Sequence, residues 1–135
     1  MANKLKKVLK TIVGANQNAY VEGRFIGEAT RLISDVLEVT KECNIEGYMV
    51  MMDVEKAFDS MDHGFLIDVL KVFGFGANFI DWIEIILTNQ ESCVINGGNS
   101  TGYFNLERGA RQGDPISAYL FILVIEVFFS NDVKG

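Results

Sequence analysis

Cysteine and proline are almost absent from this sequence. Its 135 residues include two cysteines, Cys43 and Cys93, and one proline, Pro115. Two distant cysteines exclude a disulfide framework and lack the close pairing that is typical of a zinc site. A lone proline and the lack of Gly- or Ser-rich runs leave no sign of an interdomain linker. We therefore expect one compact domain, or a piece of a larger one, in a reducing intracellular compartment; nucleus and cytoplasm are not distinguished.

Positive charge is also scarce. The chain carries 12 lysines and arginines against 18 acidic residues, a net charge of −6, whereas nucleic-acid backbones favour basic surfaces. Four lysines lie within the first ten residues, where their pattern favours the solvent-exposed face of an amphipathic helix over contacts with phosphates. A nucleic-acid enzyme built on this chain would need basic surface from segments outside it.

Long apolar runs are missing as well. The longest, residues 118–125, is followed by Glu126 and falls well short of the roughly 20 residues that cross a bilayer. No membrane segment is therefore expected. With 49% hydrophobic residues, the composition is nevertheless that of a folded, globular chain.

The patterns that are present predict an α+β fold, with helices packed on a small antiparallel sheet. Apolar residues at helical spacing predict helices at residues 5–13, 29–37, 62–73, 77–87 and 119–129. Of these, the second is expected to pack on the sheet and the fourth to be largely enclosed. An uninterrupted apolar run predicts a strand buried on both faces at residues 48–52. Strands at 92–96 and 103–106, joined by a glycine turn, complete the sheet.

An acidic residue, Asp53, follows the predicted buried strand. At the mouth of a strand its carboxylate can hold Mg²⁺, which prefers hard oxygen ligands; alternatively, an Asp here simply begins a turn or caps the next segment. Asp59 follows six residues later, and we favour a structural role for it, as a cap or as the partner of a local cation. Phosphatases with an Asp nucleophile typically carry a second Asp two residues on, where this chain has Glu55, so that class is set aside.

A second candidate site is the loop RGARQGDPIS at residues 108–117. Gly113 permits close approach of a ligand to the backbone, and the Gln112 amide can both donate and accept hydrogen bonds. The guanidinium group of Arg111 suits phosphate. The same composition also fits a surface loop rich in turn formers, and sequence separation does not say whether this loop folds beside Asp53.

The order of these blocks resembles the reverse transcriptase domain of non-LTR, LINE-type retrotransposons over nearly the whole chain. The matching segments are QNAYVEGR at 17–24, DVEKAFDSMDH at 53–63, GFG at 74–76, Trp82, VING at 94–97 and RGARQGDPIS at 108–117. A single block can arise by accident, whereas an ordered series of this kind is highly specific.

The resemblance implies a set of site residues. Asp53 would be catalytic and would bind a metal, Mg²⁺, together with the carbonyl of Val54. Phe58 would be the gate that excludes a 2′-hydroxyl and so selects deoxynucleotides. The residues implied to bind the incoming nucleotide, besides Phe58, are Gln112, Gly113 and Arg111. His63 is expected to make a structural contact.

By the same resemblance, the parent enzyme would extend a DNA primer on an RNA template with dNTPs, by two-metal phosphoryl transfer. Residues 1–135 would be an incomplete fingers–palm portion of a right-hand polymerase. We expect them to lack the thumb and the aromatic-Ala-Asp-Asp block that supplies the other metal carboxylates. The isolated chain is therefore expected to be inactive.

Two alternatives remain open. In the first, the chain is a non-enzymatic relic or interaction protein, derived from a retrotransposon reading frame, whose uncovered apolar surface binds a partner or self-associates. In the other alternative it is a generic α-rich scaffold in which both motifs are surface loops. Sizing chromatography bears on the first, because a large uncovered apolar surface disfavours a well-behaved monomer.

Overall fold

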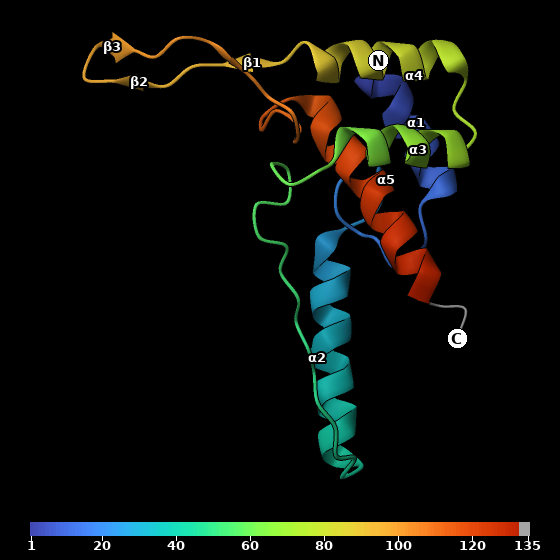
Figure 1. Ribbon diagram of the computed structural model, residues 1–135. Helices are drawn as coiled ribbons and strands as arrows, with labels where there is room; N and C mark the ends of the chain where they lie inside the picture. Colours follow the sequence, from blue (N-terminus) through green and yellow to red (C-terminus); the bar gives the residue numbers. More distant parts are fainter. Residues whose placement is uncertain (133–135) are drawn as a thin grey trace. The chain divides into compact units, whose positions relative to one another are not determined.

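A computed structural model describes residues 1–132 of the chain (Figure 1). The chain forms two compact units, Met1–Glu55 and Lys56–Gly135. The sequence carries no linker at this junction, which falls inside the DVEKAFDSMDH block. Nothing within the described residues is a helix long and apolar enough to cross a membrane.

The first unit begins with helix α1, Ala2–Ile12. Its apolar residues Leu5 and Leu9 are fully buried, and Val13, directly after the helix, is buried too. The lysines on the other face are largely exposed, although Lys6 forms an ion pair of 3.3 Å with Glu22. The amphipathic helix predicted from the sequence is thus confirmed.

The loop after α1 is fastened by one side chain, that of Arg24. Its guanidinium donates hydrogen bonds to the carbonyl oxygens of Val13 (3.1 Å), Gln17 (2.7 Å) and Gly14. These carbonyls lie at and just beyond the C-terminal end of α1, where a helix favours positive charge. Arg24 therefore ties residues 14–24 to the end of the helix.

Helix α2, Ile26–Glu42, forms where the sequence predicts a helix, but it buries none of its residues. Its apolar side chains remain open to solvent, and this holds for Leu32, Ile33, Val36, Leu37 and Val39. The expected packing of this helix on a sheet is not observed, because no strand is present among residues 1–55. The result is an apolar helix face that is largely exposed to solvent.

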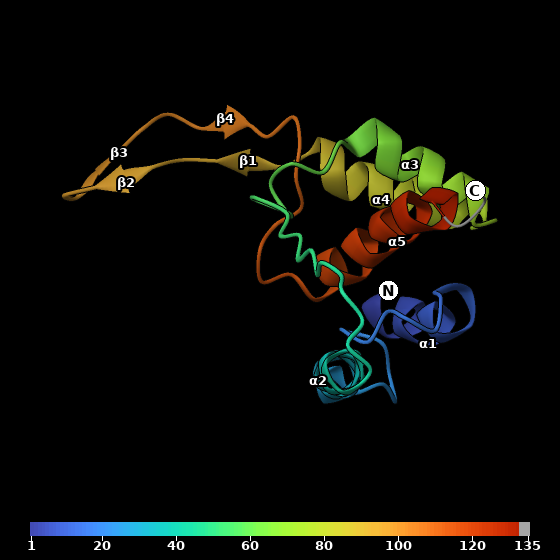
Figure 2. The ribbon, with the colours of Figure 1, turned by 90° about the horizontal axis from the view of Figure 1, so that it is seen from below.

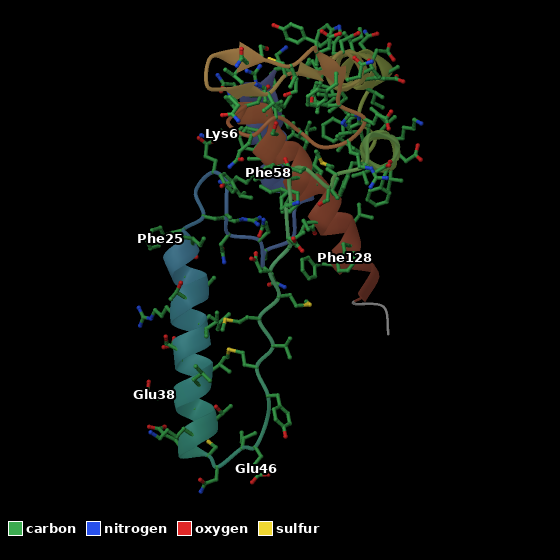
Figure 3. All side chains as sticks on the ribbon, turned by 60° about the vertical axis from the view of Figure 1, so that its left-hand side comes forward. Lys6, Phe25, Glu38, Glu46, Phe58 and Phe128 are labelled. Atoms are coloured by element: carbon green, nitrogen blue, oxygen red, sulfur yellow. The ribbon has the colours of Figure 1, made fainter. Side chains whose placement is uncertain are left out.

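The prediction of a buried strand at residues 48–52 is wrong. This segment is extended but forms no strand, and Val50 and Met51 are 78% and 84% exposed. Figures 1 and 3 show it running back along α2, from Glu46 near the end of the helix. A strand needs a neighbour to accept and donate its backbone hydrogen bonds. Within the described part of the chain, residues 46–54 form no backbone hydrogen bond with any neighbour.

The second unit is built on three helices, α3 (His63–Val72), α4 (Ala77–Thr88) and α5 (Pro115–Asp132). Helix α3 packs against both α4 and α5 (Figure 2). The side chains that form their shared core are Leu66, Val69, Leu70, Ile80, Ile83, Leu87, Ile116, Leu120, Ile122 and Leu123. The expected enclosure of α4 is wrong, because Trp82 and Ile85 lie more than half exposed on its outer face.

Both ends of α3 follow the sequence prediction. Asp62 caps the start, since its Oδ1 accepts a hydrogen bond of 2.9 Å from the N–H of Phe65. At the other end Gly74 adopts a left-handed conformation, φ +74°. The N–H groups of Gly74 and Phe75 donate to the carbonyls of Lys71 and Leu70, which is a Schellman motif.

Between α4 and α5 the chain forms a long antiparallel ribbon. Strand β1 (Glu91–Ser92) pairs with β4 (Phe104–Asn105), and β2 (Ile95–Asn96) pairs with β3 (Asn99–Ser100). The two turn residues Gly97 and Gly98 have positive φ, +57° and +84°, as a tight two-residue hairpin requires. The predicted hairpin is confirmed, although residues 99–100, expected in the turn, pair as β3; the class is α+β. Helix α3, however, packs against α4 and α5, and over the described residues these three helices do not pack on the strand pairs.

Candidate functional site

Two motifs that are distant in sequence meet inside the second unit. The N–H groups of Gly109 and Ala110 donate hydrogen bonds of 2.8 Å to the carbonyls of Met61 and Phe58, respectively. An isolated β-bridge joins Asp62 to Arg108 beside them. The structure thus brings Phe58 and the start of the RGARQGDPIS loop together, which the sequence could not establish.

Gly109 is the closest point of this junction. Its φ is +87°, and a Cβ built there would lie 3.0 Å from the Cα of Asp59 and from the carbonyl oxygens of Asp59 and Phe58. All three are backbone atoms, which cannot rotate aside as a side chain can. This position therefore requires glycine for two separate reasons: any other residue would be strained at this φ, and its Cβ would crowd the neighbouring backbone.

His63, the first residue of α3, forms a hydrogen bond with the backbone carbonyl of the same glycine. Its Nε2 lies 2.7 Å from the carbonyl oxygen of Gly109 and is partly buried. Because a carbonyl only accepts hydrogen bonds, Nε2 carries the proton in this contact. This is the kind of structural contact that was expected for His63.

The ring of Phe58 is half buried against helix α5. Its centroid lies 5.3 Å from that of Phe121, with the rings tilted by 41°, a geometry that aromatic pairs favour. Figure 3 shows the labelled ring in the second unit. One face of a rigid, bulky side chain is therefore supported by the helix.

The loop between the junction and α5 is open to solvent. Arg111, Gln112 and Gly113 are all exposed, and Gly113, with φ +92°, has no atom within 4 Å of where a Cβ would lie. Asp114 ends the loop: its N–H donates to the Arg111 carbonyl (3.2 Å), and its Oδ1 accepts from the N–H of Ile116 (3.0 Å). A defined turn thus leaves the Gln112 amide, the Arg111 guanidinium and the backbone of Gly113 open to solvent.

Asp53 and Val54 belong to the first unit, and both are exposed. The Asp53 carboxylate and the Val54 carbonyl are hard oxygen donors of the kind that Mg²⁺ takes. No group of three or more His, Cys, Asp or Glu side chains suited to a metal occurs within residues 1–132. The described residues therefore fit only part of a magnesium site.

Asp59 departs from its predicted role. Its side chain is exposed and, among residues 1–132, forms neither a helix cap nor an ion pair, so the expected cap or local cation pairing is wrong. Instead its backbone contributes, through the N–H that donates to the Lys56 carbonyl (2.9 Å) and through the close approach of Gly109. Lys56 itself has φ +51°, which is unusual for a residue with a side chain.

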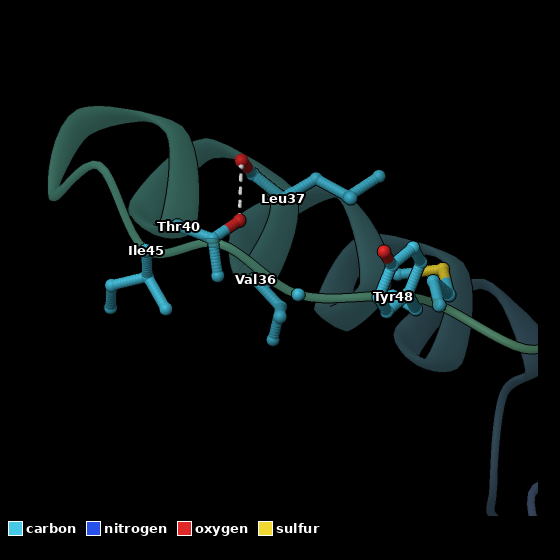
Figure 4. A pocket seen from close by; sticks show the side chains of 7 residues that line it. Val36, Leu37, Thr40, Ile45 and Tyr48 are labelled. Carbon is cyan, nitrogen blue, oxygen red and sulfur yellow. Dashed lines mark hydrogen bonds between the residues drawn. The ribbon is translucent and has the colours of Figure 1, made fainter.

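A pocket of about 130 Å³ lies in the first unit (Figure 4). Its lining residues are Val36, Leu37, Thr40, Ile45, Gly47, Tyr48 and Met49. None is charged, and the Thr40 hydroxyl already donates to the Leu37 carbonyl (3.0 Å). The pocket is therefore a gap between α2 and residues 45–49 rather than a place for phosphate or metal chemistry.

Two structural residues were not assigned by sequence reasoning, Gly109 and Arg24. The signal for Gly109 is weak, because many loop glycines are tolerated rather than required. Arg24 stood in the QNAYVEGR block, but nothing in that block names carbonyl oxygens as its partners.

The loop geometry and the sequence blocks agree with one class of protein. The chain matches the family described as reverse transcriptase (RNA-dependent DNA polymerase) over residues 1–132. It therefore belongs to that family.

The relatives confirm the resemblance to non-LTR retrotransposon proteins. The chain is 34% identical, over 93% of its length, to a Xenopus laevis protein described as Transposon TX1 uncharacterized 149 kDa protein. It is 35% identical, over 58% of its length, to the Pol polyprotein of the Drosophila melanogaster type-2 retrotransposable element R2DM, and 28% identical, over 85%, to that of a Nasonia vitripennis R2 element. It spans only 10%, 8% and 11% of these relatives, respectively. No solved structure matches the chain significantly.

Proposed function

We propose that this chain is part of the fingers–palm region of an RNA-directed DNA polymerase, and that it binds the incoming deoxynucleoside triphosphate. The observation that carries the proposal is the junction in the second unit. There, hydrogen bonds from Gly109 and Ala110 hold the loop with Gln112 beside the turn with Phe58. The parent enzyme would use an RNA template and a DNA primer.

The three side chains at this junction have distinct roles in the proposal. Phe58 excludes a 2′-hydroxyl by its bulk, because its ring is backed by Phe121 and cannot retreat. Gln112 and the backbone of Gly113 line the nucleotide pocket, and Arg111 faces the phosphates.

The metal would be held in part by Asp53 and the carbonyl of Val54. When bound, Mg²⁺ supplies positive charge that offsets the charge developing on the transferred phosphoryl group. A two-metal arrangement needs more carboxylates than these residues provide, and in the proposal those come from outside the present sequence. We accordingly propose that the 135-residue chain alone does not polymerise.

Nucleic acid would reach the site with help from other parts of the parent protein. The chain carries a net charge of −6, and phosphate backbones repel such a surface. The proposed location is inside the cell, where a template RNA is available; nucleus and cytoplasm are both compatible with this role.

Nucleotide binding to the purified chain tests the proposed site directly. We expect dATP, titrated into the ¹⁵N-labelled chain, to shift the amide signals of Gln112 and Gly113 and to leave those of α4 unchanged. Gln112→Ala should weaken this response severalfold, because one amide that donates and accepts is lost. Asn99→Ala, in strand β3 of the ribbon, is the matched control. The proposed site is contradicted if dATP shifts the amide signals equally in Gln112→Ala and Asn99→Ala. It is also contradicted if residues 111–113 of the wild type show no shift.

Primer extension tests the inactivity of the isolated chain. With Mg²⁺, an annealed primer and template, and all four dNTPs, the purified chain should give no product above that of Asp53→Ala. Extension by the wild type that Asp53→Ala abolishes would overturn this part of the proposal.

The exposed apolar surface of the first unit favours a second candidate function, that of a retrotransposon-derived interaction protein. Its members lie on α2 and on residues 48–52, and include Leu32, Val39 and Val50. Exposed apolar side chains that gather on one unit are typical of a contact site. A monomer by sizing chromatography at high concentration would argue against this alternative.

A further inference from the structure

Gly109 is held through both of its backbone polar groups. Its N–H donates to the Met61 carbonyl (2.8 Å), and its carbonyl lies 2.7 Å from Nε2 of His63. The next N–H, that of Ala110, donates to the Phe58 carbonyl (2.8 Å). We call these three hydrogen bonds the clasp. Only the bond from His63 depends on a side chain, so only that bond can be removed by substitution without touching the backbone.

The clasp fixes both walls of the proposed nucleotide pocket. One wall is the ring of Phe58, whose backbone is bonded to Ala110 and whose ring meets Phe121 of α5. The other wall is Gln112 and Gly113, which lie in the short segment between Ala110 and the first residue of α5, Pro115. Both ends of that segment are therefore connected to Phe58, and a shift at Gly109 changes the spacing of the walls.

We propose that His63 is a positioning residue for the choice between deoxy- and ribonucleotides, acting through the carbonyl of Gly109; this rests on the proposed function. Exclusion of a 2′-hydroxyl is steric, so it depends on how closely the ring and the loop are spaced. The hydrogen bond that His63 forms is to Gly109, which belongs to neither wall, and its contribution is to hold Gly109 in place. Loss of its single hydrogen bond should lower the preference for deoxynucleotides about three- to tenfold.

Two variants at this position separate the hydrogen bond from the volume of the side chain. His63→Leu removes the donor and keeps an apolar side chain of similar size. His63→Gln keeps an N–H donor at about the distance of Nε2, so it should restore the clasp. Neither change alters the Asp62 cap. Asn89→Ala is the matched control, because it removes another side-chain bond to a carbonyl, that of Ile85 (2.9 Å), at the end of α4.

Hydrogen exchange of the 135-residue chain tests the clasp without reference to any activity. In His63→Leu the amides of Gly109 and Ala110 should exchange about three- to tenfold faster, while that of Ile83 in the helical core stays unchanged. His63→Gln and Asn89→Ala should leave both unchanged. Equal acceleration at Ile83 and Gly109 would mean general destabilisation, and no acceleration would mean no clasp; either result overturns the proposal.

Titration with dATP and with ATP then tests the positioning role. The wild type should prefer dATP, judged from the amide shifts of Gln112 and Gly113; His63→Leu should lose most of that preference, and His63→Gln should regain it. An unchanged preference in His63→Leu overturns the inference. If the wild type binds neither nucleotide while the exchange results hold, the proposed function fails, and with it the positioning role, although the clasp stands.

Discussion

Gly109 and Gly98 offer a comparison at the scale of single residues. Their φ angles are nearly equal, +87° and +84°, but a Cβ at Gly109 would meet three backbone atoms at 3.0 Å, whereas Gly98 has open space. Gly98→Ala should therefore cost only the conformational strain, about 1 to 2 kcal/mol. Gly109→Ala should cost about 3 to 5 kcal/mol, because crowding adds to the strain.

Urea unfolding followed by the fluorescence of Trp82, the sole tryptophan, measures both glycine variants. Trp82 lies in α4 of the same unit. Equal costs for the two substitutions would show that the approach of Gly109 to Asp59 is not as close as described.

Arg24 gives a second prediction at the residue scale. Arg24→Ala should destabilise the loop at residues 14–24 by about 2 to 3 kcal/mol, since three carbonyl oxygens lose a charged donor. Arg24→Lys keeps the charge but cannot reach three acceptors with a planar fork, so it should recover only part of this. The measurement is hydrogen exchange at Leu9 and Val13.

Arg31→Ala is the control for Arg24. Its ion pair with Asp35 is solvent-exposed and 3.7 Å long, and such pairs contribute little. The role assigned to Arg24 fails if both substitutions change exchange in α1 to the same small extent.

At the scale of elements, helix α3 depends on its cap. Asp62→Ala should cost about 1 kcal/mol, because the N–H of Phe65 loses its acceptor. Asp62→Asn should retain most of the stability, since Asn caps about as well as Asp. Thermal unfolding monitored by circular dichroism is the measurement, with exposed Asp81 of α4 as the site of a matched Asp→Ala control. A cost for Asp81→Ala as large as that for Asp62→Ala would refute the specific role of the cap.

Helices were predictable because their signals are local. The Asp62 cap, the stop at Gly74 and the glycine turn at 97–98 each act within a few residues, and the structure has all of them. The strand at 48–52 failed for the opposite reason. An apolar run is suited to a buried strand, but a strand forms only when another segment pairs with it, and the local sequence does not identify that segment.

The candidate site likewise combines residues that local motifs identify with contacts between distant residues that they do not. Phe58, Gln112 and Gly113 could be named from motifs, and their roles remain predictions. Their meeting through Gly109 and His63 could not be foreseen, because 46 residues separate the two partners. Asp59 was misjudged, since its contribution comes from its backbone and not from the carboxylate that drew notice.

At the scale of the whole molecule, the first unit leaves a strand-like segment with both edges open. Residues 48–52 are uncharged and exposed, and they carry no proline. Such edges tend to pair with another chain. We expect the purified chain to associate as its concentration rises, and Val50→Lys to reduce this association severalfold.

Val72→Lys is the control for this prediction, because Val72 on α3 is as exposed as Val50, 79% against 78%. Sedimentation velocity over a range of concentrations gives the measurement. If both lysine variants reduce association equally, added charge is the cause and the open edge is not.

The open edges of residues 48–52 also matter during synthesis on the ribosome. Another 83 residues follow Met52 in this sequence, and ribosomes add roughly 5 to 20 residues per second. The segment is therefore exposed for at least about 4 to 17 seconds while these residues are added, whereas hairpins form within microseconds. Throughout that time it is an unpaired, uncharged stretch of a nascent chain, which is a feature that promotes association between neighbouring nascent chains.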